Sequence, residues 1–427
     1  MSVETTYLYD KRHVQGDPAK KTDYGWRFQG KTVLLHEDAS IIYDDSAAQM
    51  EAALRETSME FFFLDRCLQC GMCTTWCPNS LIPGPGNLSP RELVQQLRLG
   101  LLDLSGQELW FCTNCGGCTT NCPYEIPLID VIISLRRLAL KEGAGYVPAS
   151  LKRVLSSVKA FGNPYREEQG KRAEWLKAAS FQPVESEGGV LLFVGCSSSY
   201  DPRATKIARS AVRLLGRMGI AFDVLGEREA CCGDGVRRVG DQETYDKLRT
   251  TNKSNIEARK PGSIYALSPH CAHAMKTGYF ENDAQFAVKP FVLLLHDAIE
   301  KGALAFTKTI NKKATYHDPC FLAKHGGIHE EPREILRGIE GLEVVEMKHN
   351  RCDALCCGGG GGGVWLDRKK GERLAEARLE EALASGADIL VTSCPFCLSM
   401  MEDAAKNDER CSRLRVMDLC ELACEAL

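Results

Sequence analysis

The sequence lacks any apolar run long enough to cross a membrane. A spanning helix needs about 18 or more consecutive apolar residues, whereas the longest apolar runs here, such as 190–194 and 291–295, have only the length of a strand. The sequence also lacks an excess of charge of one sign, because 53 basic and 57 acidic residues give a formal charge of −4. This balance argues against nucleic acid and an anionic membrane surface as general partners.

Residues 1–10 also lack the apolar segment of a signal peptide. We therefore expect a cytoplasmic protein that reaches the inner face of the cytoplasmic membrane only through a partner. Cysteine, in contrast, is abundant, with 21 among 427 residues. In a reducing compartment, so many cysteines indicate metal binding rather than disulfides. The length predicts two or three domains.

Two runs of four cysteines share the spacing C-x2-C-x2-C-x3-C, and a proline follows each run. This is the signature of a two-cluster ferredoxin, in which the fourth cysteine of one run ligates the cluster of the other. Zinc is the alternative, but four-cysteine zinc sites usually separate two C-x2-C pairs by a longer stretch. We therefore predict two [4Fe-4S] cubane clusters, one on Cys67, Cys70, Cys73 and Cys122 and the other on Cys112, Cys115, Cys118 and Cys77.

The runs lie in a segment with helical patterns. Apolar residues at helical spacing in 50–65 lead into the first run, a capping box at 89–92 begins a helix to about residue 102, and a last helix closes near 143. We expect a helical ferredoxin domain at 51–143. Residues 1–50 are left unassigned, with a short strand at 31–35, and 144–187 are predicted to be a linker with helical pieces.

From residue 188 onward, short apolar runs alternate with amphipathic helices, which predicts parallel sheets wrapped by helices. The expected strands are at 190–194, 222–225, 264–267, 315–317, 342–346 and 389–392. Cysteines recur here at offsets of 124–126 residues, which indicates a duplicated domain, at 188–310 and 311–427. The fold class is thus α+β and multidomain: an all-helical ferredoxin domain followed by two duplicated α/β domains with parallel sheets.

The duplicated pattern is a CCG motif. Cys196, Cys231-Cys232-Gly233 and Cys271 recur as Cys320, Cys356-Cys357-Gly358 and Cys394-x2-Cys397. With the ferredoxin runs, it resembles the catalytic subunit of heterodisulfide reductase, of the type that fuses a two-cluster ferredoxin to the CCG repeat, over residues 61–427. The resemblance implies that each complete motif holds a noncubane [4Fe-4S] cluster where a disulfide is cleaved. The implied ligands and catalytic residues of the second motif are Cys320, Cys356, Cys357, Cys394 and Cys397.

The first motif departs from this pattern. Ser268 stands where the second motif has Cys394, so only Cys196, Cys231, Cys232 and Cys271 are left as ligands. Four thiolates accept an iron–sulfur cluster, cubane or modified noncubane, or a zinc ion. The metal of this motif stays open, and His270 or His273 would complete a zinc site if it holds zinc.

Other interpretations of these residues are also open. The adjacent pairs Cys231-Cys232 and Cys356-Cys357 are alternatively redox-active disulfides. The glycines of 358–363 match a dinucleotide fingerprint only trivially, and we expect them to let the backbone approach a cluster before an amphipathic helix at 364–383. His317 and His325 are candidates either to deliver protons to a departing thiolate or to support the site structurally.

Two functions follow from the resemblance. In the first, an oxidoreductase subunit of anaerobic metabolism takes electrons from a flavoprotein or a membrane cytochrome b. It relays them singly through the cubanes to the second CCG domain, where a disulfide/thiol pair is reduced or oxidised. In the alternative, the chain relays electrons between a flavoprotein dehydrogenase and a cytochrome b or quinone, without a small-molecule substrate of its own. The iron–sulfur subunits of anaerobic glycerol-3-phosphate dehydrogenase and glycolate oxidase are similar, and Ser268 favours this alternative slightly.

Overall fold

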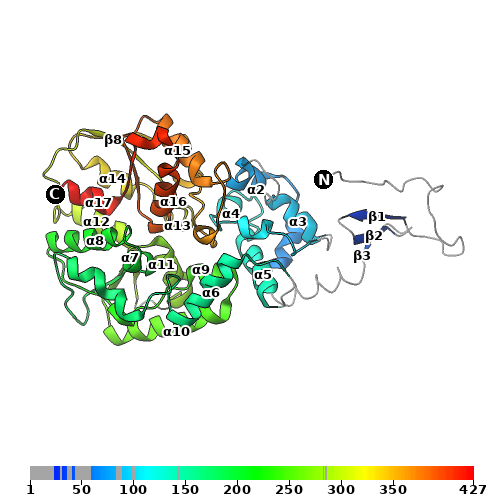
Figure 1. Cartoon of the computed structure of the whole chain (residues 1–427), viewed down its shortest axis with the longest axis horizontal. Helices are drawn as coiled ribbons and strands as arrows, with labels where there is room; N and C mark the ends of the chain where they lie inside the picture. The colour runs from blue at the N-terminus through cyan, green and yellow to red at the C-terminus, as the bar shows by residue number, and fades with distance from the viewer. Residues whose placement is uncertain are drawn as a thin grey trace, which may run out of the picture.

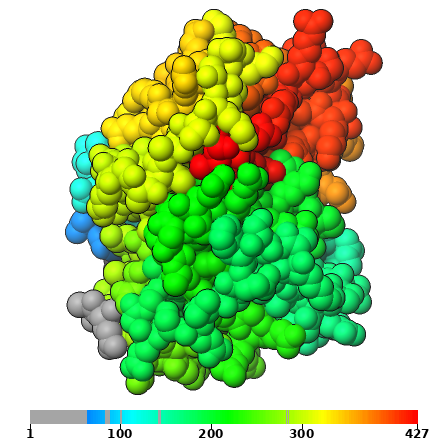
Figure 2. All heavy atoms as spheres, turned by 90° about the vertical axis from the view of Figure 1, so that its left-hand side faces the viewer, coloured from blue at the N-terminus to red at the C-terminus, as the bar shows by residue number. Residues whose placement is uncertain are grey.

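The computed structural model describes residues 24–28, 31–35, 41–43, 59–82, 89–98, 102–141, 145–281, 283 and 286–427. In Figure 1 the helical ferredoxin unit lies beside both copies of the duplicated domain, which we call the first repeat (188–310) and the second repeat (311–427). The copies pack on each other, and green residues of the first meet yellow and red residues of the second in Figure 2. The predicted fold class is confirmed.

A small antiparallel sheet precedes the ferredoxin unit. Its order is β1-β2-β3, and the predicted strand at 31–35 coincides with β2. Residues 50–58 of the helix predicted at 50–65 lie outside the described residues. A 3-10 helix begins at residue 59. The elements are β1 (Tyr24–Phe28), β2 (Lys31–Leu35), β3 (Ile41–Tyr43) and η2 (Met59–Arg66).

The ferredoxin unit is helical, as predicted. Ser89 accepts a hydrogen bond from the backbone N–H of Glu92 and Pro90 opens helix α3, so the helix begins where the capping pattern placed it. The predicted end near 143 lies outside the described residues, and the helix predicted to end near 102 is described as helical only to Arg98. The elements are α2 (Met72–Thr75), η3 (Pro78–Leu81), α3 (Pro90–Arg98), η4 (Glu108–Phe111), α4 (Gly117–Thr120) and α5 (Leu128–Lys141).

The segment predicted as a linker packs into the protein core. Helix α6 (Ala149–Phe161) buries Leu151 and Val158 in a hydrophobic core that the ferredoxin unit shares with the first repeat. The 3-10 helix η5 (Gln169–Ala178) carries Arg172 to the cysteines of the first repeat. The segment therefore helps to fix the orientation of the ferredoxin unit.

Both repeats have a four-stranded parallel sheet with the same strand order. The sheet orders are β5-β4-β6-β7 and β9-β8-β10-β11, so the strands of each repeat follow the order 2-1-3-4. This identity supports a duplication. The strands are β4 (Val190–Phe193), β5 (Phe222–Asp223), β6 (Ser263–Ala266), β7 (Val288–Pro290), β8 (Lys312–Tyr316), β9 (Leu342–Val344), β10 (Ile389–Thr392) and β11 (Arg415–Asp418).

Helices of the two repeats cover the sheets and form the contact between the repeats, with α17 packed on α8 and α12 on α14. In the first repeat they are α7 (Cys196–Tyr200), α8 (Thr205–Arg217), η6 (Gly226–Arg228), α9 (Asp234–Val239), α10 (Gln242–Arg259), α11 (Pro269–Ala274), η7 (Met275–Tyr279) and α12 (Phe291–Glu300). In the second they are α13 (Cys320–Gly326), α14 (Glu331–Arg337), η8 (Arg351–Asp353), η9 (Gly363–Trp365), α15 (Leu374–Ala384), α16 (Pro395–Lys406), η10 (Glu409–Arg413) and α17 (Leu419–Glu425).

The predicted helix at 364–383 is wrong in its first half. Only residues 363–365 form a turn of 3-10 helix, and the α-helix begins at Leu374. Between them, the Arg368 guanidinium donates to the carbonyl oxygen of Phe111 in the ferredoxin unit, and Gly371 has a φ of 86°. Docking on the ferredoxin unit and a left-handed turn thus replace the first helical turns.

Within the described ranges, no helix combines the length and apolarity needed to cross a membrane.

Candidate metal centres

The cysteines of each repeat converge at the carboxyl ends of the strands. In the first repeat, Cys196 begins the helix after β4, and Cys271 lies in the helix after β6. The pair Cys231-Cys232 follows β5 and η6. Strands β4 and β6 are neighbours at the position where the strand order reverses, which is where open α/β sheets form their sites.

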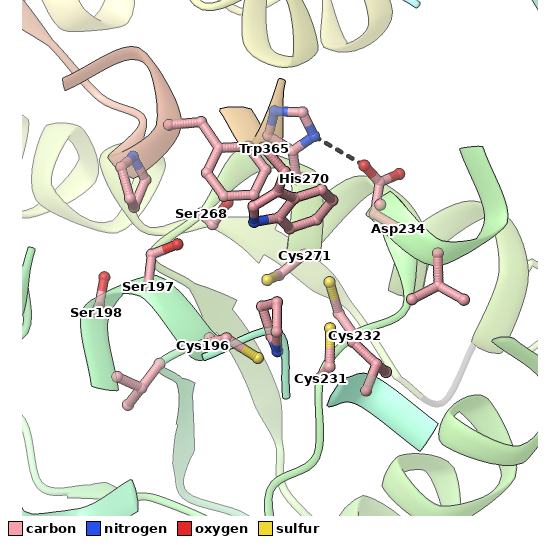
Figure 3. Close-up of a pocket in the computed structure, with 18 residues that line it drawn as sticks. Cys196, Ser197, Ser198, Cys231, Cys232, Asp234, Ser268, His270, Cys271 and Trp365 are labelled. Atoms are coloured by element: carbon pink, nitrogen blue, oxygen red, sulfur yellow. Dashed lines mark hydrogen bonds and ion pairs between the residues drawn. The ribbon is translucent and has the colours of Figure 1, made fainter. Parts of the chain in front are cut away.

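Four thiols meet in the first repeat. Figure 3 shows the sulfur atoms of Cys196, Cys231, Cys232 and Cys271 around one space. Neighbouring thiols are in hydrogen-bond contact, from Cys196 through the adjacent pair to Cys271. The contact with Cys231, followed by burial, raises the pKa of Cys196 well above its usual range. Both Nη atoms of buried Arg172 lie 3.6 Å from the Cys196 sulfur, so a positive charge faces this site.

Ser268 lines the same cavity as these thiols (Figure 3). The cavity has a volume of about 40 Å³ and is bounded on its other side by Trp365 and Phe396 of the second repeat. The first repeat therefore offers four sulfur atoms and one hydroxyl, in a space that the second repeat covers.

All five cysteines of the second motif come together, and all are buried. Their thiols are in contact in the order 320, 356, 357, 397 and 394. The Cys357 and Cys397 sulfur atoms are 3.2 Å apart. Hydrogen bonds from Cys356 and Cys397 lower the pKa of Cys357 to about 5. The backbone N–H groups of Gly358 and Gly359 also point at sulfur atoms of the adjacent pair, at 3.3 and 3.5 Å.

In the ferredoxin unit, the fourth cysteine of the first run lies with the second run. Burial, followed by the nearby Cys115 and Cys112, raises the pKa of Cys77 to about 12. Cys118 interacts with the same three thiols. In the other group, Cys73 interacts with Cys67 and Cys122, and Cys70 is exposed. The structure thus brings Cys77 together with the second run and Cys73 together with Cys67 and Cys122, and the ligand assignment itself stays a prediction.

The second ferredoxin group directly adjoins the five-cysteine site. The Cys115 and Cys356 thiols lie close enough to interact, although one belongs to the ferredoxin unit and the other to the second repeat. Cys356 also donates to the Thr113 hydroxyl at 3.4 Å. Next to them, the His325 ring nitrogen Nε2 lies 3.2 Å from the Asn114 carbonyl oxygen. Two candidate metal centres therefore touch through ligand side chains.

The glycine run explains how the two units approach so closely. A Cβ atom at Gly360 would lie 2.3 Å from the Thr113 carbonyl oxygen, and one at Gly361 would lie 2.4 Å from that of Cys112. From the sequence we predicted that the backbone of the glycine run approaches a cluster closely. The sequence did not indicate that this backbone also packs against the ferredoxin unit. The run leads into a short 3-10 helix and follows a cysteine pair, so it lacks the strand–helix context of a dinucleotide site.

His270, a sequence candidate for a zinc ligand of the first motif, lines the cavity of the first repeat. Its Nδ1 atom lies 2.8 Å from a carboxylate oxygen of Asp234, shown as a dashed line in Figure 3. The ring also forms a hydrogen bond with Cys394 of the second repeat. Its position two residues after Ser268 was the available signal, but the sequence did not indicate that it reaches the other repeat.

The donor set fits metal clusters. All 21 cysteines are free thiols, so the adjacent pairs are not disulfides here. Buried, mutually repelling thiols without a metal ion are unfavourable as thiolates, whereas iron or zinc compensates their charge. Sites of four and five thiols, in which the backbone N–H groups of Gly233, Gly358 and Gly359 are aimed at sulfur, suit iron–sulfur clusters.

Comparisons with known proteins agree with this organisation. Residues 190–276 and 314–402 match a cysteine-rich domain family, and residues 63–126 match a 4Fe-4S dicluster domain family. The fold and its cysteine sites thus define an iron–sulfur oxidoreductase subunit that joins a dicluster ferredoxin unit to two cysteine-rich (CCG) domains.

Among curated relatives, a dihydromethanophenazine:CoB–CoM heterodisulfide reductase subunit from Methanosarcina barkeri is 32% identical, with 87% of this chain and 96% of the relative covered. The chain belongs to this family. It is also 29% identical to the probable iron–sulfur-binding oxidoreductase FadF of Bacillus subtilis (84% and 59% covered) and 32% identical to the EtfAB:quinone oxidoreductase of Syntrophomonas wolfei (77% and 48% covered). The chain spans only about half the length of these last two relatives.

Proposed function

We propose that the chain carries electrons singly from the ferredoxin unit to the second repeat, where a disulfide/thiol pair is reduced or oxidised. The observation that carries this proposal is the contact between Cys115 and Cys356, because electron transfer between two centres is favoured when their ligands touch. When bound, two cubane clusters and a noncubane [4Fe-4S] cluster would supply the one-electron chemistry. The disulfide takes up two electrons and two protons and leaves as two thiols.

The residues around these sites have the roles that such a reaction requires. The five cysteines of the second repeat would hold the terminal cluster, and the eight of the ferredoxin unit would hold the cubanes. The cavity between the repeats is lined by the four cysteines of the first motif and would hold the metal of the first site. The proposed electron partner is a flavoprotein or a membrane cytochrome b, with the chain on the cytoplasmic face of the membrane.

A second candidate function is electron relay to a quinone without a disulfide substrate. Ser268 supports it, because the first repeat has lost one of the five thiols that a complete motif has. One relative is named for a quinone and another as a probable membrane-anchored ferredoxin, which supports this class of reaction for the present chain. In this version the first site holds zinc or a cluster that only stabilises the fold.

Anaerobic EPR during stepwise redox titration distinguishes the two functions. Disulfide chemistry predicts a paramagnetic signal that appears on oxidation only when a thiol is present, in addition to the cubane signals of the reduced protein. Normal cubane signals with no thiol-dependent signal would contradict disulfide chemistry and leave the relay function. Dithiothreitol serves as the thiol probe, and its oxidised form serves as the disulfide.

A further inference from the structure

The loop before Cys320 is held in one conformation by two buried arginines. Arg333 forms two hydrogen bonds to the carboxylate of Asp318, at 2.6 and 2.9 Å. The Nε atom of Arg378 lies 3.0 Å from Nδ1 of His317, and the His317 backbone N–H donates to the Val391 carbonyl oxygen at 2.8 Å. His317 is 1% exposed and Arg378 is fully buried. The orientation of the imidazole ring is thus fixed.

The contact with Arg378 determines which ring nitrogen of His317 carries the proton. A guanidinium group has only donors and does not lose its protons in proteins. Nδ1 of His317 must therefore accept the hydrogen bond, so it has no hydrogen of its own. The imidazole is neutral, and its proton lies on Nε2. Arg378 is itself held in place, because it donates to the His349 carbonyl oxygen at 2.6 Å and to Glu381.

The His317 ring lies beside the sulfur atoms of the second repeat. A ring nitrogen of His317 and the sulfur atoms of Cys357 and Cys397 all lie within 4.8 Å of one another. Because Arg378 occupies Nδ1, Nε2 is the nitrogen left to interact with these sulfur atoms. Among the described residues, Nε2 has no hydrogen-bond partner. A buried donor without an acceptor costs about 1–3 kcal/mol, so its persistence points to an acceptor that occupies the site.

We propose that His317 donates a hydrogen bond from Nε2 to sulfur at the second-repeat site and is not a metal ligand. His317, Cys357 and Cys397 have the composition of a metal-binding group. Coordination by Nε2 would need a lone pair on that atom. Because Arg378 donates to Nδ1, the proton of the neutral ring lies on Nε2, which therefore has no lone pair to offer. The inference rests on the proposed function in one respect, that the five cysteines hold an iron–sulfur cluster. His317 is then a positioning residue that acts through the cluster sulfur.

A hydrogen bond to sulfur has a measurable consequence. It stabilises the more negative, reduced form of an iron–sulfur cluster and thereby raises its reduction potential. The His317→Phe variant keeps a planar ring but loses the donor. We expect this variant to retain the iron content of the wild type and to have a lower midpoint potential at the second-repeat site only. The His317→Gln variant retains an N–H donor and should recover part of the shift.

The test uses the full-length, anaerobically purified protein with its clusters. Electron–nuclear double resonance on the second-repeat signal of the wild type is recorded in H2O and in D2O. We expect an exchangeable proton coupling that disappears in His317→Phe, with no strong nitrogen coupling. The His329→Phe variant is the matched control, since that side chain is 31% exposed and outside the site, and it should change neither signal.

The outcomes separate this inference from the proposed function. A strong nitrogen coupling in the wild type, or loss of iron from His317→Phe, would identify His317 as a ligand and overturn the inference while the proposed function stands. A wild-type second-repeat signal without an exchangeable proton coupling would also overturn the inference about His317. If the wild type has no cluster signal from the second repeat, the inference and the proposed function are both overturned. The wild-type spectra decide the question even if a variant does not fold.

Discussion

At the scale of single residues, the cysteine sets of the two motifs differ at one position. The hydroxyl oxygen of Ser268 stands where the second repeat has the sulfur of Cys394. Ser268→Cys restores the fifth thiol in a cavity that already contains the other four, so we expect the first site to acquire the spectroscopic signature of the second. The Ser199→Cys variant is the control, because Ser199 is buried nearby but its hydroxyl donates to the Gly195 carbonyl. Identical EPR spectra of Ser268→Cys and the wild type would contradict this expectation.

Loss of a ligand in the second repeat should remove one centre and spare the others. Cys394→Ala eliminates a fully buried thiol that contacts Cys397. We expect the noncubane signal to disappear and both cubane signals to persist in anaerobic EPR. Cys411→Ala, a buried cysteine outside every predicted site, should leave all signals intact. If Cys394→Ala lost a cubane signal and Cys411→Ala did not, the assignment of Cys394 to the noncubane site would be wrong.

The sequence identified the cysteines because their spacing repeats, but it did not identify the residues that surround them. Arg172 and Arg378 lie in no motif of the sequence, and His270, although it precedes Cys271, gave no sign that it reaches the second repeat. Their contacts join residues far apart along the chain, as from Arg172 to Cys196 or from His270 to Cys394. Only the tertiary fold brings such residues together, so no local pattern predicts their roles.

At the scale of elements, helix α5 connects the ferredoxin unit to both repeats through Arg136. This fully buried side chain donates to the carbonyl oxygens of Leu109, Cys112, Arg238 and Gly361. Burial lowers its pKa to about 10, so it stays charged at neutral pH. Carbonyl groups of the ferredoxin unit, the first repeat and the second repeat thus share one cation.

Replacing this side chain should loosen the ferredoxin unit. Arg136→Met leaves four carbonyl groups without their donor, and at about 1 kcal/mol for each we expect a loss of about 4 kcal/mol in the free energy of unfolding. Thermal unfolding followed by circular dichroism measures it. Arg153→Met on the exposed face of α6 is the control. If both variants melt at the wild-type temperature, Arg136 does not hold the units together.

The prediction of elements succeeded where periodicity is local. The strand pattern of the repeats and the helices of the ferredoxin unit followed from it, as β4, β6 and α5 illustrate. It failed at 366–373, where an arginine docks on another unit, and it did not anticipate that α6 belongs to a core. In both places tertiary contacts override a local pattern.

At the scale of the whole molecule, the half-buried His325, which lies between the second repeat and the ferredoxin unit, predicts sensitivity to acid. Burial, followed by the charge of Arg238, lowers the pKa of His325 from its usual 6.5 to about 3. The unfolded chain therefore binds a proton between pH 6.5 and 3 that the folded protein does not. The stability that depends on neutral His325 is complete above pH 6.5 and is lost as the pH falls toward 3.

His325→Phe removes this titration. The variant loses the hydrogen bond to Asn114 and should be less stable at pH 7, but its stability should fall less steeply with acidification than that of the wild type. Denaturant unfolding at a series of pH values from 7 to about 4 measures both slopes, whose difference corresponds to at most one proton per chain. Parallel curves would rule out His325 as the group responsible.

The central claim is that thiolates are bound by iron from the ferredoxin unit to the second repeat. Iron, acid-labile sulfide and zinc analysis of anaerobically purified protein, combined with Mössbauer spectroscopy, tests it most directly. Two cubanes and one noncubane cluster predict about twelve iron atoms per chain, and more if the first repeat also holds a cluster. A colourless protein with only zinc, or with its cysteines paired as disulfides, would contradict the account.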